Sequence, residues 1–383
     1  MMDNLDSSVS ISSIGLDVLQ DIISLRGDIF DTSSLNSFNR AYHPNGQLSA
    51  TGYIDANGNA DGVITGYYEN GCLKYEVTYV AGELRGIAKG YYENGTLKFE
   101  GNFMQGEYFG VWKEFHTNGS LATVIHRRAS FEQVIEEYYE NGNIKFQGLS
   151  TGYGLCKKED GIEKSYYENG NLKSEIPFVN GEKHGVIRGY YEDGNLKSEA
   201  TCEHGSPVGV GKTYYENGNI RTETPFMFGR VDGLKKEYYE NGNIRYETLY
   251  RNGEIYGIEK EYYENGALKA ETPYQNNDKN GARAEYYENG FLKAEIQYRD
   301  DCKMGVEKEY YENGNLKCEV RYHNGSKQGP AKWYRESGEV IVEITYQNDK
   351  AVSGRCCKDN RQLTGAHLHR MDKEGVVESG ICS

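Results

Sequence analysis

The chain has 383 residues, 37% of them hydrophobic, with 34 Tyr, 47 Gly and a formal net charge of −15. So few aliphatic side chains cannot fill a thick interior, and an acidic chain lacks the clustered Lys and Arg that nucleic acid or an anionic membrane requires. No apolar stretch approaches the ~20 residues of a membrane span, and the opening MMDNLDSSVS is unlike a secretory signal. We therefore expect a cytoplasmic protein without nucleic-acid or membrane partners.

The first element lies in residues 1–39, which do not share the pattern of the rest of the chain. Within SSIGLDVLQDIISL the apolar residues recur at helical spacing. They are Ile14, Leu16, Val18, Leu19, Ile22 and Ile23. An array of repeats needs a cap at its end, so one interpretation is a short helical cap over the first repeat.

From residue 40 to residue 350 the chain repeats one short sequence motif. YYENG occurs nine times, YYEDG once, ending at Gly194, and three degenerate copies end at Gly46, Gly119 and Gly338. The last seven intervals between these glycines are each 24 residues. A fixed period of this length indicates an array of supersecondary units rather than one closed core.

The copy GIEKEYYENGALKAETPY, residues 257–274, shows what one unit predicts. Asn-Gly at the centre favours a two-residue type I′ turn, which would make the unit a β-hairpin and fix its register. The pairs expected opposite one another are Tyr263 with Leu268, Tyr262 with Lys269, Lys260 with Glu271, and Gly257 with Tyr274. Eight of the thirteen copies then place a basic residue opposite Glu, which supports this register.

This register also assigns the side chains to two faces. Tyr239, Tyr263 and Tyr287 are expected to hold the fold, while the other face presents Tyr, Lys and Glu to a protein partner. The candidate partner-binding residues are Tyr238, Tyr262, Tyr286, Tyr310, Lys269 and Lys293. The alternative is that these tyrosines only pack along the array.

Spacing and cysteine usage divide the chain further. We expect hairpins over residues 40–130, an irregular break over 131–160, a regular hairpin array over 161–350 and a cap over 351–383. The eight Cys show no CxxC pair, which favours free thiols. The C-terminal group Cys356, Cys357, His367 and His369 matches no zinc spacing, so we predict no metal and no cofactor.

The motif GxxKxYYENGxLKxE, followed by an aromatic residue, resembles the variant MORN repeat. The resemblance implies an all-β repeat protein, an elongated single-layer antiparallel meander of ~13 stacked 24-residue β-hairpins, without an enzymatic site. Bacterial proteins of this kind are often antitoxin or immunity components, and related arrays act as scaffolds.

Residues 1–39 with Arg40 faintly resemble an F-box. Leu16, Val18, Leu19, Ile22 and Ile23 would lie on its first helix, and a second helix would carry Leu35, Phe38, Asn39 and Arg40. Such leaders on variant MORN arrays are typical of large DNA viruses of amoebae, which would place the protein in a host cytosol or a virion.

Two functional hypotheses follow. The first is a non-enzymatic scaffold for protein–protein interaction, including a viral or host-directed F-box-like adaptor. The second is an antitoxin or immunity protein that occludes a basic toxin, in keeping with the acidic charge. The sequence does not decide between them or set the oligomeric state.

Overall fold

The computed structural model describes residues 40–127 except 54, 56 and 58, then 132–151, 160–374, and residue 382. The chain forms two compact units, unit 1 with residues 1–156 and 166–170, and unit 2 with residues 157–165 and 171–383. The helical cap and F-box-like residues expected before residue 40 lie outside the described residues. Arg40, expected at the end of the second F-box-like helix, instead begins a strand.

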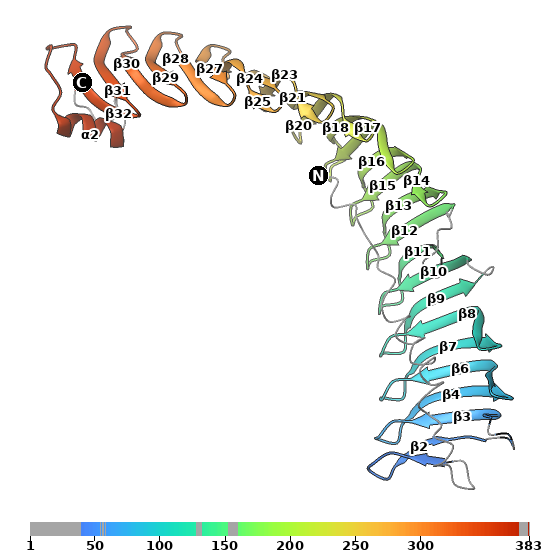
Figure 1. Ribbon diagram of the computed structural model, residues 1–383. Coiled ribbons are helices and arrows are strands. Elements are labelled where there is room, and N and C mark those ends of the chain that lie inside the picture. Colours follow the sequence, from blue (N-terminus) through green and yellow to red (C-terminus); the bar gives the residue numbers. More distant parts are fainter. Residues whose placement is uncertain are drawn as a thin grey trace. The chain divides into compact units, whose positions relative to one another are not determined.

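In the described part the chain is almost entirely strand (Figure 1). The strands of unit 1 are β1 (Arg40–Tyr42), β2 (Leu48–Thr51), β3 (Gly62–Tyr67), β4 (Leu73–Val80), β5 (Glu83–Leu84), β6 (Gly86–Tyr91), β7 (Leu97–Met104), β8 (Glu107–Phe115), β9 (Leu121–Arg127), β10 (Glu132–Tyr138) and β11 (Ile144–Thr151).

Strands β12 to β32 follow, with one helix near the C-terminus. They are β12 (Gly161–Tyr166), β13 (Leu172–Val179), β14 (Glu182–Lys183), β15 (Gly185–Tyr190), β16 (Leu196–Glu203), β17 (Ser206–Tyr214), β18 (Ile220–Met227), β19 (Arg230–Val231), β20 (Gly233–Tyr238), β21 (Ile244–Arg251), β22 (Glu254–Ile255), β23 (Gly257–Tyr262), β24 (Leu268–Gln275), β25 (Asp278–Lys279), β26 (Gly281–Tyr286), β27 (Leu292–Arg299), β28 (Cys302–Tyr310), β29 (Leu316–His323), β30 (Ser326–Tyr334), β31 (Val340–Gln347), β32 (Lys350–Cys356) and α2 (Gly365–Glu374).

Within each unit the strands stack as antiparallel hairpins in a single layer, and the second strand of one hairpin pairs with the first strand of the next. A strand stands before and after the turn in each of the thirteen sequence copies. The expected all-β array of repeated hairpins is therefore confirmed. Within the segment expected to be irregular, residues 132–151 form the hairpin β10–β11, and residues 152–159 lie outside the described part.

The hairpin turn is one residue longer than expected. Tyr263 N donates to Ala267 O, and Gly266 N donates to Tyr263 O, which closes a three-residue loop. Only Gly266 is left-handed, with φ of 88°, whereas a type I′ turn would need Asn265 there as well. Asn265 instead stabilises the turn through its side chain, because its Oδ1 accepts a hydrogen bond from Ala267 N at 2.9 Å. The predicted type I′ turn was therefore wrong.

The register beyond the turn is nevertheless the expected one. Lys260 lies opposite Glu271, and Gly257 lies opposite Tyr274. Next to the turn Leu268 pairs with Tyr262, so the expected pairs of Tyr262 with Lys269 and of Tyr263 with Leu268 are both wrong. A β-bulge at Lys269 offsets the extra turn residue and restores the pairing farther along.

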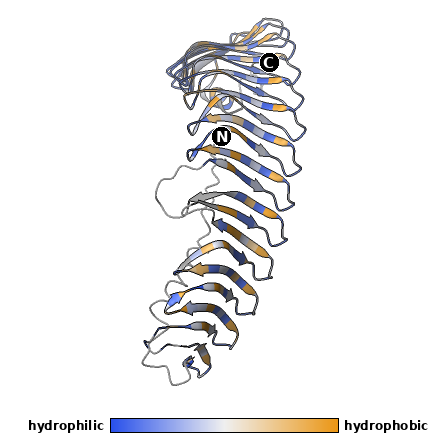
Figure 2. Ribbon diagram, turned by 90° about the vertical axis from the view of Figure 1, so that its right-hand side faces the viewer, coloured by the Kyte–Doolittle hydropathy of each residue, from blue (hydrophilic) through white to orange (hydrophobic). Residues whose placement is uncertain are grey.

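Alternation along the strands gives each hairpin two faces, and apolar and polar residues alternate accordingly (Figure 2). In the repeat of residues 257–274, face A carries Ile258, Lys260 and Tyr262, with Glu271 and Pro273 on the paired strand. Face B carries the intervening side chains, which are Glu259, Glu261, Ala270, Thr272 and Tyr274. We use these two names for the equivalent positions of every repeat.

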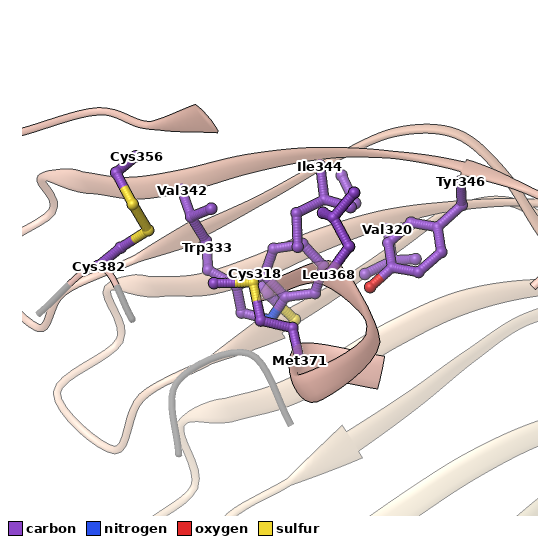
Figure 3. Close-up of a cluster of buried hydrophobic side chains, with 11 residues drawn as sticks. Cys318, Val320, Trp333, Val342, Ile344, Tyr346, Cys356, Leu368, Met371 and Cys382 are labelled. Carbon is purple, nitrogen blue, oxygen red and sulfur yellow. A yellow bond between two sulfur atoms is a disulfide. The ribbon is translucent and has the colours of Figure 1, made fainter. Parts of the chain in front are cut away.

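Face B holds the main buried clusters. In unit 1 the cluster is Ile64, Tyr75, Val77, Leu84, Ala88, Phe99, Phe103 and Trp112. At the C-terminal end of unit 2, Leu368 and Met371 of α2 lie against a second cluster that includes Trp333, Val342 and Ile344 (Figure 3). The core is thus a thin layer on one face, and α2 covers part of it.

A disulfide joins Cys356, the last residue of β32, to Cys382. The expectation of free thiols was wrong for this pair. It is confirmed for the other described cysteines, which are Cys72, Cys202, Cys302, Cys318 and Cys357. The disulfide fastens the chain beyond α2 to the edge strand of unit 2.

Candidate functional site on face A of unit 2

The predicted tyrosines Tyr238, Tyr262, Tyr286 and Tyr310 form a column on face A. They are partly buried, and each hydroxyl points to a Glu of the preceding repeat. Tyr262 donates to Glu247 at 2.9 Å, and Tyr238 donates to Glu223 at 2.8 Å. Burial and this carboxylate partner raise the pKa of both hydroxyls to about 12. The column therefore has a clear role within the array, whether or not it also binds a partner.

The adjacent tyrosines Tyr239, Tyr263 and Tyr287 link repeats in the opposite direction. Tyr263 Oη donates to the backbone oxygen of Tyr286 at 2.8 Å, and its two equivalents do the same in their repeats. The turn asparagines add a third link, since Asn241 Nδ2 donates to Glu264 O at 3.1 Å. The YYENG motif is thus a set of connectors between neighbouring hairpins.

Lys269 and Lys293 do not lie beside the face A tyrosines. Lys269 Nζ lies 2.8 Å from Glu261 Oε1, and Lys293 Nζ lies 3.9 Å from Glu285 Oε2, both on face B. The bulge next to the turn brings these lysines to the opposite side from the one expected. The six predicted partner-binding residues therefore do not form one surface.

A ladder of Lys and Glu runs along face A. Lys260 lies opposite Glu271 in its own hairpin and opposite Glu247 in the preceding one, and Lys236 repeats the pattern. Lys260 Nζ is 3.7 Å from Glu271 Oε1. The hydrogen bond from Tyr238 is the largest cause lowering the pKa of Glu223, ahead of Lys212. Charges that alternate in this way fix register but give face A no net preference for a basic partner.

Sequence reasoning missed a column of exposed apolar side chains beside this ladder. Each directly follows a glycine in the first strand of its repeat. The column comprises Ile162, Val186, Val210, Leu234, Ile258 and Val306, which are 37–55% exposed. The sequence contains the pattern that could have predicted this column, namely Gly followed by Ile, Val or Leu once in each of these repeats.

The second strands widen this column. Val210 lies opposite Pro225, Ile258 opposite Pro273, and Leu234 opposite Leu249. Two strands at about 4.8 Å each separate equivalent side chains by about 10 Å. Between Ile258 and Val306 the same position is occupied by Ala282, which lies opposite Gln297, so this repeat exposes less apolar surface than its neighbours. Unit 2 therefore presents a periodic apolar stripe, defined by these residues, flanked by balanced charge.

Face B of the same unit has a hollow of about 320 Å³ bounded by Arg283, Tyr298 and several Lys and Glu side chains. Its cations are paired within the wall: Arg283 and Lys293 with Glu285, Lys303 with Glu307, and Lys317 with Glu309. Such pairing leaves little charge to attract an ionic ligand. The described residues contain no group of His, Cys, Asp and Glu that could hold a metal ion. None of the helices described there has the length and apolar character to cross a membrane.

Two solved structures show distant similarity to the chain. A crystal structure of TcdB2-TccC3 is 14% identical, over 79% of this chain and 18% of that chain, with a TM-score of 0.16. A crystal structure of TcdB2-TccC3-Cdc42 is 10% identical, over 82% of this chain and 26% of that chain, with a TM-score of 0.11. The chain thus spans about a quarter or less of either protein, and the scores support no argument from them. No curated protein matches the chain.

The repeat itself has a clear family match. The MORN repeat variant matches residues 60–81, 84–105, 134–150, 159–180, 183–201, 207–227, 231–252, 255–276, 279–300, 305–324 and 327–348. These segments make up more than half of the chain, and their turns carry the Tyr and Asn connectors described above. The hairpins β1–β2 and β8–β9 lie outside the matched segments although they have the same form. The chain belongs to the MORN repeat variant family.

Proposed function

We propose that the protein is a non-enzymatic scaffold that binds a protein partner along face A of unit 2. The observation that carries the proposal is the apolar stripe. Side chains such as Val210 and Ile258 are each 54% exposed, and they recur at one position of successive repeats. Contiguous exposed apolar surface is typical of a protein-interaction site.

The chemistry of the stripe indicates the kind of partner. Apolar contacts about 10 Å apart suit an extended or repetitive protein that offers apolar side chains at a similar spacing. Each contact is small, so affinity would come from several repeats acting together. The flanking ladder would orient the partner without selecting one sign of charge.

More specific roles belong to the same proposal as alternatives. An F-box-like adaptor would use Leu16, Val18, Leu19, Ile22 and Ile23 to recruit a ubiquitin ligase, and an antitoxin would bind a basic toxin. The cytoplasmic location and the absence of nucleic-acid and membrane partners stay predictions. The experiment below separates the alternatives because it identifies the partner that is captured.

The test compares two triple variants as bait for affinity capture and mass spectrometry. V210T, L234T and I258T together remove apolar surface and place a β-branched side chain, which suits a strand, at all three positions. E216S, E240S and E264S together change three exposed turn residues at the same period and serve as the control. We expect the first variant to lose the partner and the control to retain it, both with an unchanged circular dichroism melt. Equal capture by both variants would overturn the proposal.

A further inference from the structure

Asn-Gly pairs occur at two kinds of turn in the chain, and this dipeptide is chemically labile. Asn241 and Asn265 stand in YYENG turns, whereas Asn252 and Asn324 stand in the connecting turns that join one hairpin to the next, each followed by Gly. In water the backbone nitrogen of the glycine can attack Cγ of the asparagine, because glycine has no side chain to hinder the approach. Nδ2 leaves as ammonia with the proton of the glycine amide, and a succinimide ring forms. Water then opens this ring to Asp or isoaspartate, so the reaction exchanges ammonia for water and needs no oxidant or reductant.

In the YYENG turns both ends of the asparagine side chain are held. Asn241 Oδ1 accepts from Asn243 N at 2.9 Å, and its Nδ2 donates to Glu264 O of the next repeat at 3.1 Å. Asn265 is held in the same way, because its Oδ1 lies 2.9 Å from the backbone nitrogen two residues on and its Nδ2 lies 3.4 Å from Glu288 Oε2. To bring Cγ to the glycine nitrogen, the side chain has to rotate and give up these hydrogen bonds. Contact with the next hairpin therefore opposes the reaction.

In the connecting turns the asparagine side chain is not held. Asn252 and Asn324 are exposed and left-handed, with φ of 52° and 48°. Asn252 N donates to Asp232 Oδ2 at 2.8 Å, but among the residues that the structure describes neither side-chain amide makes a hydrogen bond. The glycine nitrogen is hydrogen-bonded in both kinds of turn, at 2.8 Å for Gly253 and 2.9 Å for Gly266. The side chain of the asparagine is thus what distinguishes the two kinds of turn.

We propose that Asn252 and Asn324 are sites of spontaneous deamidation in the folded protein, whereas the asparagines of the YYENG turns are protected by the hydrogen bonds that link the hairpins. Giving up two hydrogen bonds before the reaction should slow it by about tenfold or more at the YYENG turns. The proposal is independent of the partner-binding role of face A.

Each reaction adds one negative charge to a connecting turn. The backbone nitrogen of residue 252 donates to Asp232, so a new carboxylate at residue 252 lies close to an existing one and should weaken this link between connecting turns. Isoaspartate also carries the backbone through the former side chain, which lengthens the turn between β21 and β22 by one carbon atom. The modification therefore changes both the charge and the geometry of the turn.

The copy YYEDG shows what the product would do in a YYENG turn. Asp193 Oδ1 accepts from Asn195 N at 2.9 Å, as the asparagines do, but a carboxylate cannot donate to the next repeat. Asn195 Nδ2 supplies the donor instead, to Glu216 O at 3.1 Å. Asn265 is followed by Ala267, which has no side-chain donor. Deamidation of Asn265 would therefore remove a link that this turn does not replace.

The experiment follows the wild-type, full-length protein during incubation in mildly alkaline buffer made with heavy-oxygen water, which marks each carboxylate that the reaction forms. Digestion by trypsin in ordinary water then leaves later deamidation unmarked. Asn252 lies in the peptide NGEIYGIEK and Asn265 in the next one, EYYENGALK, so one mass spectrum compares the two. We expect the first peptide to gain the label about tenfold faster or more. Equal rates in the folded protein would overturn the proposal.

The matched control is the same incubation in guanidinium chloride, with circular dichroism to verify that the first sample stays folded and the second does not. Both asparagines precede glycine, so in the unfolded chain the two peptides should gain the label at similar rates. A tenfold difference that persisted in the unfolded chain would assign the contrast to local sequence, and the proposal would fail.

Discussion

Unit 1 and the middle of unit 2 use the same hairpin but fill face B differently. In unit 1 the face is aromatic and aliphatic, with Phe99 stacked on Trp112 at 5.1 Å between ring centroids. From β20 to β27 it carries Lys, Glu, Arg and Thr, such as Thr248, whose hydroxyl bonds Glu259. What the two regions share is the column of Tyr and Asn connectors. The difference indicates that hydrogen bonds from the repeated Tyr and Asn side chains can stabilise the stack of hairpins, and that unit 1 has an apolar core in addition to them.

The largest effect is expected when residues at the same repeat position of the two regions are replaced. Trp112 stands two residues after Gly110 and Glu259 stands two residues after Gly257, so the two residues occupy the same position of their repeats. Trp112→Ala should lower the free energy of unfolding of its region by about 3–5 kcal/mol, because it removes a buried ring. Glu259→Ala should cost about 1 kcal/mol, because Thr248 loses its acceptor. Hydrogen exchange of each region measures both, and similar losses would contradict the contrast.

A second test concerns the two Tyr columns of unit 2. Y239F, Y263F and Y287F remove hydroxyls bonded to backbone carbonyls, and Y238F, Y262F and Y286F remove hydroxyls bonded to Glu. We expect each triple variant to lose roughly 1 kcal/mol per hydroxyl. Thermal melts followed by circular dichroism would measure this.

Sequence alone assigned stability only to the first Tyr column. A second triple variant that melts like wild type but loses the partner would restore that assignment. Equal destabilisation of the two variants would mean that both columns are structural.

Alkaline pH should separate the regions because the connectors titrate. The pKa values of Tyr214, Tyr238, Tyr262 and Tyr334 are raised to about 12, first by burial and then by the hydrogen bond to Glu. A raised pKa means that stability is fully present below the ordinary value of 10.0 and is lost as pH rises toward 12.

Since these tyrosines are only partly buried and solvent screens the interaction, we expect a moderate effect, strongest in unit 2. Tyrosinate absorbance and circular dichroism recorded together from pH 9 to pH 12 would follow it. Ionisation of all tyrosines near pH 10 without loss of strand signal would show that the hydrogen bonds to Glu are unimportant.

The smallest effect should come from the Lys–Glu ladder. Lys260→Ser removes one exposed ion pair and should cost under about 1 kcal/mol, with the loss shrinking at high salt. Lys260→Arg is the control and should melt like wild type. A salt-independent loss of several kcal/mol would mean that the ladder contributes as much to stability as the aromatic cluster does.

The sequence allowed the hairpin array and its register to be predicted because period and cross-strand charge pairs are both local patterns. It could not show that Asn265 keeps a negative φ, since Asn-Gly suits either turn and only the hydrogen bonds distinguish them. Because the turn was predicted wrongly, Lys269 was also assigned to face A, whereas it lies against Glu261 on face B. The bond between Cys356 and Cys382 has no spacing signature, because it depends on where α2 returns the chain.

The candidate site was predicted only in part. Choosing face A depended on the conspicuous tyrosines, whereas the exposed positions are the less conspicuous Val210 and Ile258. A residue such as Val in a strand is ordinarily counted toward a core. In a one-layer sheet that assumption fails, because one face lacks a partner layer unless another segment provides it.

The connectors of the YYENG turn have a consequence for how such a chain can change length. Each hairpin that carries the YYENG turn offers its neighbour the same hydroxyls, carbonyls and amides, so joining two such repeats at equivalent positions would leave an interface like those between the other YYENG repeats. Gain or loss of one 24-residue unit should therefore alter the array in steps of about 10 Å without a new interface having to evolve. The turn thus sets the length added by each repeat, and unequal recombination between repeats can change the length of the array.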